Sequence, residues 1–276
     1  MAEHASLASY LKDRRTRLDP ATLGLSGPRR RTPGLRREEV AQRANISPTW
    51  YTWLEQGRGG APSAEVLDRI ARALMLTDIE REHVFLLGLG RPPEVRYQPR
   101  DGITPRLQRV LDAMSPAPAL LRTVTWDVVA WNDAAAAVLT DYAVLAPRDR
   151  NILRRMFLDP ASRASQVDWE SVARYVVGVF RAEATRAGAA RTVQPLVDEL
   201  CQASADFAAM WCDNDVRGAG EGVKRLRHPV LGEIDLEFSG FAVDGRSDLS
   251  MLVYNTVAAS DLERITALIA AGRNRR

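Results

Sequence analysis

The stretch at residues 35–57 constrains the fold of this chain more than any other segment. It runs LRREEVAQRANISPTWYTWLEQG, and its apolar spacing predicts a helix over residues 36–44 with one buried face. Asn45 then suits a sharp turn, because asparagine tolerates the left-handed backbone conformation. Two short helices joined by a tight turn are therefore expected.

The second predicted helix has a clear start and a clear end. Ser47 suits the N-cap, where its hydroxyl can accept a bond from an unpaired backbone N–H, and Pro48 suits the first helical position. Gly57 suits the residue just past the end, where a positive φ is wanted. Tyr51 and Leu54 are expected to face the core, which leaves an outward surface of Thr49, Trp50, Thr52 and Trp53. Two tryptophans on one outward surface indicate a contact face.

Positive charge is concentrated around these two helices. Residues 29–43 hold two acids, Glu38 and Glu39, against six arginines: Arg29, Arg30, Arg31, Arg36, Arg37 and Arg43. Residues 1–100 carry 17 Lys and Arg against 12 Asp and Glu, whereas residues 101–276 carry 21 against 23. Helical hairpins also occur in many all-α proteins, so the geometry alone is weak support. A basic cluster beside a groove-sized helix, however, is typical of phosphate contacts and predicts double-stranded DNA as the partner.

The same segment resembles the helix-turn-helix of phage-repressor-like regulators, the XRE family, in register from Leu35 to Pro62. The longer strings RRRTPGLRREEVA and SPTWYTWLEQGR are similar to the MmyB-like subfamily. This resemblance implies a bacterial DNA-binding transcription regulator.

Specific roles follow for the side chains around the second helix. Arg37 and the helix N-terminus are expected to hold a phosphate, with Arg58 as a second candidate. Thr49, Thr52 and Trp53 are expected to meet base edges.

The complete expected DNA-binding set is Arg31, Arg36, Arg37, Ser47, Thr49, Trp50, Thr52, Trp53 and Arg58. Trp50 is expected to pack on sugar and backbone. Arg31 belongs to the loop at residues 19–34, which lies along the DNA backbone, reaches the minor groove, or is a solvated loop that orders only on DNA. A homodimer is expected, because one short helix reads only a few base pairs.

The length of 276 residues predicts two domains. Helical spacing also occurs near residues 6–17, 62–74 and 77–87, which completes an all-α, five-helix helix-turn-helix domain over residues 1–90. Proline and glycine dominate a linker at residues 91–105. Residues 106–276 form the second domain, for which we expect small-molecule binding and dimerisation.

The second domain is expected to be α+β with an antiparallel sheet. Strand-like runs occur near residues 119–124, 128–131, 223–227, 234–238 and 249–257, with helices between the second and third runs and after the last. This order resembles a PAS-like sensor, a domain that the MmyB-like subfamily carries. The matching stretches are VVAWND and GVKRLRHPVLGEIDLEF.

The resemblance implies a small apolar ligand such as a fatty acid. The expected ligand-binding residues are Trp131, Tyr175, Phe180, Trp211 and Phe238, with plain core packing as the alternative for each. One departure concerns Asn214, where the subfamily often has histidine. If that histidine holds a ligand head group, the ligand of this chain differs.

Other chemistries have little support in the sequence. No P-loop or GxGxxG string follows a strand, and His4, His83 and His228 are scattered without ligand spacing, so no metal, cofactor or enzyme activity is expected. No long apolar run is present, so a cytoplasmic protein without membrane contact is expected. Two alternatives stay open: a ligand-free dimerisation or protein-contact module as the second domain, and an enzyme with an accessory DNA-binding part.

Overall fold

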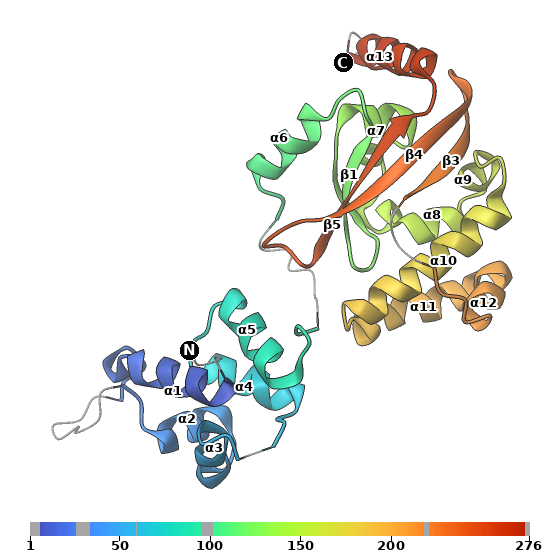
Figure 1. The fold of residues 1–276 in the computed structure, drawn as a ribbon. Helices are drawn as coiled ribbons and strands as arrows, with labels where there is room; N and C mark the ends of the chain where they lie inside the picture. Colours follow the sequence, from blue (N-terminus) through green and yellow to red (C-terminus); the bar gives the residue numbers. More distant parts are fainter. Residues whose placement is uncertain (1–5, 26–33, 59, 95–101, 218–220, 274–276) are drawn as a thin grey trace. The chain divides into compact units, whose positions relative to one another are not determined.

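The computed structural model describes residues 6–25, 34–58, 60–94, 102–217 and 221–273. The chain divides into two compact units, Met1–Pro93 and Glu94–Arg276. Figure 1 shows a helical first unit and a second unit in which helices surround a sheet. No helix within these described ranges is long and apolar enough to cross a membrane.

The described residues of the first unit form five α-helices, as predicted. These are α1 (Leu7–Arg17), α2 (Arg37–Ala44), α3 (Pro48–Glu55), α4 (Ala64–Ala73) and α5 (Asp78–Leu89), with a 3-10 turn, η1 (Pro20–Leu23), after α1. Their ends follow from local chemistry. Asn45 ends α2 with a φ of 51°, and the hydroxyl of Ser47 accepts the Trp50 N–H to cap α3.

One hydrophobic core holds these five helices together. Leu11, Leu35, Tyr51, Leu67 and Phe85 are almost completely buried in it. Burying each such side chain contributes roughly 1.5–3 kcal/mol. Packing of these faces therefore stabilises helices that are too short to be stable alone.

The second unit has the α+β architecture expected from the sequence. Its elements are α6 (Pro105–Ala113), β1 (Ala119–Thr123), β2 (Val128–Trp131), α7 (Asp133–Val138), η3 (Tyr142–Val144), η4 (Pro147–Arg150), α8 (Ile152–Leu158), α9 (Pro160–Ala164), α10 (Trp169–Arg186), α11 (Ala190–Ala203), α12 (Ala205–Cys212), β3 (Glu221–His228), β4 (Gly232–Ala242), β5 (Leu249–Thr256) and α13 (Ala259–Arg273). The strands form one antiparallel sheet in the order β2-β1-β5-β4-β3. The expected PAS-like class is thereby confirmed.

The two faces of the sheet have different environments. Leu120 and Leu236 belong to a core cluster that also takes in residues of α7 and α13, whereas Leu121 packs on the opposite face with Leu111 of α6. On the outer side of β3, Arg225 pairs with Asp235 across the strands at 2.9 Å. Alternation along the strands therefore separates buried from solvated positions.

Helices α8 and α10 to α12 lie beside one another as a helical layer (Figure 1). This layer has its own core around Phe180 and Phe207. The structure adds α8 and α9 to the elements expected from the sequence. The inner side of α10 approaches β3 and β4, and the space between them forms a cavity described below.

Candidate DNA-binding and ligand-binding sites

Helix α3 presents a polar and aromatic surface to solvent. The side chains of Thr49 and Arg58 are exposed, and Trp53 is 49% exposed. Thr52 is half-buried, and its hydroxyl donates a hydrogen bond to the Pro48 carbonyl at 2.9 Å. Hydroxyl groups beside an exposed indole are suited to contact with base edges and thymine methyl groups.

Trp50 was expected on the outward surface, and the structure leaves it only partly exposed there. The structure has this residue half-buried against the core cluster of the first unit. Trp50 lies four residues before the buried Leu54, so both fall on the same side of the helix. Trp50 is therefore only partly open to contact with DNA.

A buried ion-pair cluster, Arg15–Glu55–Arg37, fixes α3 to α1 and α2. The fully buried carboxylate of Glu55 accepts hydrogen bonds from Arg15 Nε at 2.5 Å and from Arg37 Nε at 2.7 Å. Arg15 also donates to the Leu35 carbonyl at 2.7 Å. Because the three side chains come from three helices, this cluster sets how α3 is presented.

The charge of the cluster is consistent with phosphate contact. Burial alone would raise the pKa of Glu55, but hydrogen bonds from Arg15 and Arg37 outweigh burial and leave that pKa below its ordinary value. Two guanidinium groups then share one carboxylate. Arg37 has a side chain that is 43% exposed, so its charge is held at the surface.

The other expected DNA-binding residues have varied surroundings. Arg36 is exposed and pairs with Glu38 at 3.4 Å, and Ser47 uses its hydroxyl as the cap of α3. Arg31 lies outside the described residues. The structure therefore groups Arg37, Thr49, Thr52, Trp53 and Arg58 around α3 as a candidate DNA surface.

The second unit contains a cavity of about 460 Å³ between α10 and the sheet, which we call the apolar cavity. Its wall includes Val172, Tyr175 and Val176 from α10 and Phe238 and Tyr254 from the sheet. The rings of Tyr175 and Phe238 lie 5.9 Å apart between centroids, and those of Phe238 and Tyr254 lie 6.1 Å apart. Aromatic and aliphatic walls of this kind suit a small apolar ligand.

An ion pair lines one side of the apolar cavity. Arg122 Nη2 donates to both carboxylate oxygens of Glu183 at 2.8 and 2.9 Å, and Trp126 Nε1 donates to the same carboxylate at 2.7 Å. Burial lowers the pKa of Arg122, and the charge of Glu183 opposes that effect. Since each charge has its partner, this pair closes the wall of the cavity without leaving an unpaired charge.

Of the five residues expected to bind ligand, two line the apolar cavity and three pack against the hydrophobic cores. Tyr175 and Phe238 line the apolar cavity. Phe180 is fully buried among the helices, and Trp211 stacks on the ring of Phe207 at 5.8 Å. Trp131 lies 5.3 Å from the ring of Tyr142 in the core over α7. Asn214, the position of the departure from the subfamily, is exposed and lines none of the cavities described here.

A smaller cavity of about 240 Å³, which we call the polar chamber, adjoins the apolar cavity. The two spaces share wall residues Ile152, Met156, Lys224 and Tyr254. Sequence reasoning did not select Lys224. Its signal is a lysine between Gly222 and Leu226 at the inward positions of β3, where alternation predicts an apolar side chain.

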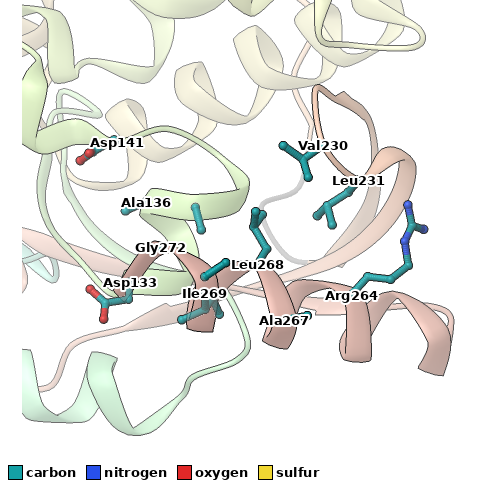
Figure 2. A pocket seen from close by; sticks show the side chains of 12 residues that line it. Asp133, Ala136, Asp141, Val230, Leu231, Arg264, Ala267, Leu268, Ile269 and Gly272 are labelled. Carbon is teal, nitrogen blue, oxygen red and sulfur yellow. The ribbon is translucent and has the colours of Figure 1, made fainter. Parts of the chain in front are cut away.

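A third hollow, about 740 Å³ in volume, lies between α7 and α13 (Figure 2). Figure 2 shows Ala136, Leu268 and Val230 around it, with Asp133 and Arg264 at opposite ends. Val230 is 71% exposed, and much of the α13 side of the hollow is exposed as well. The wall of this hollow has no aromatic side chain, unlike that of the apolar cavity, so it is the weaker ligand site.

The described residues contain no group of three or more His, Cys, Asp or Glu side chains that could hold a metal ion. Cys201 is half-buried and Cys212 is exposed, and both are free thiols. Burial raises the pKa of Cys201, which disfavours its reactive thiolate form.

Comparison with known proteins gives a consistent result for both units. Residues 6–84 match a helix-turn-helix domain, and residues 103–268, more than half of the chain, match the MmyB-like transcription regulator ligand binding domain. Among curated proteins, no significant match is found. The chain therefore belongs to the MmyB-like transcription regulators, with a helix-turn-helix DNA-binding domain followed by a ligand-binding domain.

Proposed function

We propose that this regulator binds its operator through α3 as a homodimer, and that a small apolar, fatty-acid-like ligand in the apolar cavity controls that binding. The apolar wall that α10 and the sheet form around this cavity, with Tyr175 and Phe238 on it, is the observation that carries the ligand half. Residues 1–90 serve DNA binding, 91–105 link the domains, and 106–276 bind ligand and a second copy. The second domain binds its ligand without transforming it, and the regulator acts in the cytoplasm.

The DNA half of the proposal assigns different roles to side chains on one surface. Thr49, Thr52 and Trp53 contact base edges, whereas Arg37 and Arg58 contact phosphates. The exposure of Thr49, Trp53 and Arg58 supports this division. A dimer supplies two such helices, which is needed because each reads only a few base pairs.

Thr49→Val and Arg58→Ala are expected to have different effects on DNA binding. Loss of the Thr49 hydroxyl should relax base preference at one operator position by about 1–3 kcal/mol, because a base-edge hydrogen bond is lost. Loss of Arg58 should weaken binding to all sequences alike and reduce the salt slope by about one. Operator selection from a random library, followed by binding measurements at several salt concentrations, separates the two effects. Equal losses on operator and random DNA for both variants would contradict the assignment.

Val172→Phe is expected to close part of the apolar cavity. Val172 lies on the cavity wall, and a larger ring in its place would occupy the space that a ligand needs. Native mass spectrometry of the gently purified wild type should show a bound lipid-sized mass, and Val172→Phe should reduce that bound fraction at least tenfold. Val144→Phe is the matched control, because Val144 is 78% exposed and lines none of the three cavities.

The same measurement decides between the proposal and its alternative. A wild-type protein that carries no ligand, binds no added lipid and is unaffected by Val172→Phe would favour a ligand-free dimerisation or protein-contact domain. Measuring the oligomeric state with and without lipid extract then tests whether ligand and self-association are linked.

A further inference from the structure

We propose that the polar chamber binds the head group of an amphiphile carrying both a carboxylate and a nearby hydroxyl, a hydroxy fatty acid by chemical class. This inference rests on the proposed function, because the apolar tail of such a ligand lies in the apolar cavity. It adds a second subsite and a specific polar end to that function.

The position of the polar chamber allows one ligand to occupy both spaces. Ile152 and Met156 of α8 and Lys224 and Tyr254 of the sheet line both cavities, so the two spaces meet at these four side chains. The apolar cavity has aromatic and aliphatic walls, whereas the polar chamber collects tyrosine, glutamine and basic side chains. An amphiphile with its tail in the first and its head in the second matches this division.

Lys224 supplies a positive charge that no described carboxylate neutralises. Its side chain has no hydrogen bond or ion pair with any residue that the structure describes, and its Nζ lies 5.8 Å from the centre of the Tyr254 ring. Burial, together with the nearby charge of Arg155, lowers the pKa of Lys224 to about 8. An ionised carboxylate placed beside Lys224 would relieve both effects.

Lys224 is one of only two lysines in the sequence. Arginine outnumbers lysine 36 to 2 in the chain, so a basic residue here would be arginine if only a permanent charge were required. A lysine presents a compact ammonium group on a flexible stem, whereas a planar guanidinium needs more space. The other basic side chains on the wall of the chamber, Arg155 and Arg227, are paired with Asp159 and Glu233, so Lys224 is left to receive a carboxylate.

Gln166 points to a second polar group on the ligand. This residue is 5% exposed, lines the polar chamber, and its Oε1 atom is buried without a hydrogen-bond partner. A buried acceptor left unpaired destabilises a fold, so a ligand that donates a hydrogen bond to it gains affinity. A carboxylate cannot donate, but a hydroxyl on the same ligand can.

Two buried tyrosines complete the polar surface of the chamber. Tyr142 and Tyr254 are 5% and 7% exposed, and neither hydroxyl has a hydrogen bond to a described residue. In contrast, other polar side chains of the chamber already have partners: His228 contacts the backbone through both ring nitrogens, and Ser165 donates to the Ser162 carbonyl. The groups without a partner thus include the Lys224 ammonium and the two tyrosine hydroxyls, which can donate to a carboxylate, and Gln166 Oε1, which can only accept.

The test compares amphiphiles of one chain length: dodecanoate, its methyl ester, and its 2-hydroxy and 3-hydroxy acids. With the full-length wild type, calorimetry should show dodecanoate binding at least about tenfold more tightly than the ester, because only the acid is charged. The better of the two hydroxy acids should bind about tenfold more tightly than dodecanoate, because its hydroxyl pairs with Gln166.

Two variants assign these preferences to side chains. Lys224→Met should remove the preference for acid over ester, and Gln166→Leu should remove the preference for hydroxy acid over dodecanoate while keeping the first preference. Lys12→Met is the matched control, because Lys12 is the other lysine and lies exposed on α1. It should leave both preferences unchanged.

The outcomes separate this inference from the function on which it rests. If the wild type binds dodecanoate no more tightly than its methyl ester, or binds neither hydroxy acid more tightly than dodecanoate, the inference is overturned and the sensing function stays intact. The same conclusion holds if both preferences survive Lys224→Met and Gln166→Leu. A wild type that binds none of the amphiphiles overturns the sensing function and this inference with it. The wild-type preferences need no variant, so they decide the matter even if a variant fails to fold.

Discussion

Glu55→Gln is expected to destabilise the N-terminal unit by about 3–5 kcal/mol, because it leaves the buried Arg15 guanidinium without its carboxylate. The Glu55 side chain is fully buried and that of Arg15 is 6% exposed, so solvent cannot replace the lost charge. Chemical denaturation of the full chain, followed by hydrogen exchange of peptides from α1 to α3, would measure the loss in the affected unit. Specific DNA binding should fall with it, since the cluster positions α3.

The control for this prediction is Glu38→Gln. Glu38 also pairs with an arginine, Arg36 at 3.4 Å, but its side chain is 66% exposed. Removing an exposed pair of this kind changes stability by less than about 1 kcal/mol. Equal effects of Glu55→Gln and Glu38→Gln would show that the buried cluster does not hold the helices together.

The response of the N-terminal unit to acid pH is a second test of the Arg15–Glu55–Arg37 cluster. The pKa of Glu55 is lower in the folded protein than its ordinary value of 4.5, so its ionised form contributes stability above that pH. This contribution is lost as the pH falls below the ordinary value and through the lowered folded pKa. Hydrogen exchange in α1 to α3 should therefore accelerate in acid in the wild type, and the Glu55→Gln variant should lack this part of the acid response.

Local signals in the sequence predicted the helix-turn-helix well, because caps act over a few residues. Asn45 takes the left-handed conformation, Ser47 caps α3, and Gly57 has a φ of 72°, each as expected. The role of Glu55 was not predicted. Its partner Arg15 is 40 residues earlier in the chain, and no local pattern connects the two.

In the second unit, the structure differs from the sequence-based expectations because some elements are short and because packing brings distant residues together. Helices α8 and α9 span only 7 and 5 residues, too few turns for a periodic pattern to be clear. Periodicity did identify α10, whose predicted face includes both Tyr175 and Phe180. It could not distinguish a buried side chain in the core, such as Phe180, from one that lines a cavity, such as Tyr175.

The cavity itself depends on how separate elements meet. Lys224 on β3, Tyr142 after α7 and Gln166 after α9 converge on the polar chamber from distant parts of the sequence. A strand pattern predicts which positions face inward, but it does not predict that a lysine at such a position meets a cavity. Only the packing of α8 and α10 against the sheet brings these groups together.

Gly34→Ala is expected to destabilise the N-terminal unit by about 2–5 kcal/mol, because the backbone of α1 lies very close to Gly34. Gly34 has a φ of +76°, and a Cβ there would lie 2.4 Å from the Thr16 carbonyl oxygen and 2.5 Å from the Arg15 carbonyl oxygen. Backbone atoms cannot move aside as a flexible side chain can. The segment would have to leave α1 and break the 3.0 Å hydrogen bond from Leu35 N to the Arg15 carbonyl.

Gly24→Ala separates backbone strain from this close approach. Gly24 has a similar φ of +67°, but among the described residues no atom beyond its chain neighbours lies within 4 Å of its Cβ position, so only the conformational cost of about 1–2 kcal/mol applies. Denaturation midpoints of the two variants, with binding to operator DNA at low salt, give the comparison. Because Gly34 holds the end of α1 beside the start of α2, its substitution should also displace Arg15 from Glu55 and weaken operator binding, whereas Gly24→Ala should leave binding unchanged. Equal effects of the two substitutions would mean that the contact between residue 34 and α1 is not required to present α3.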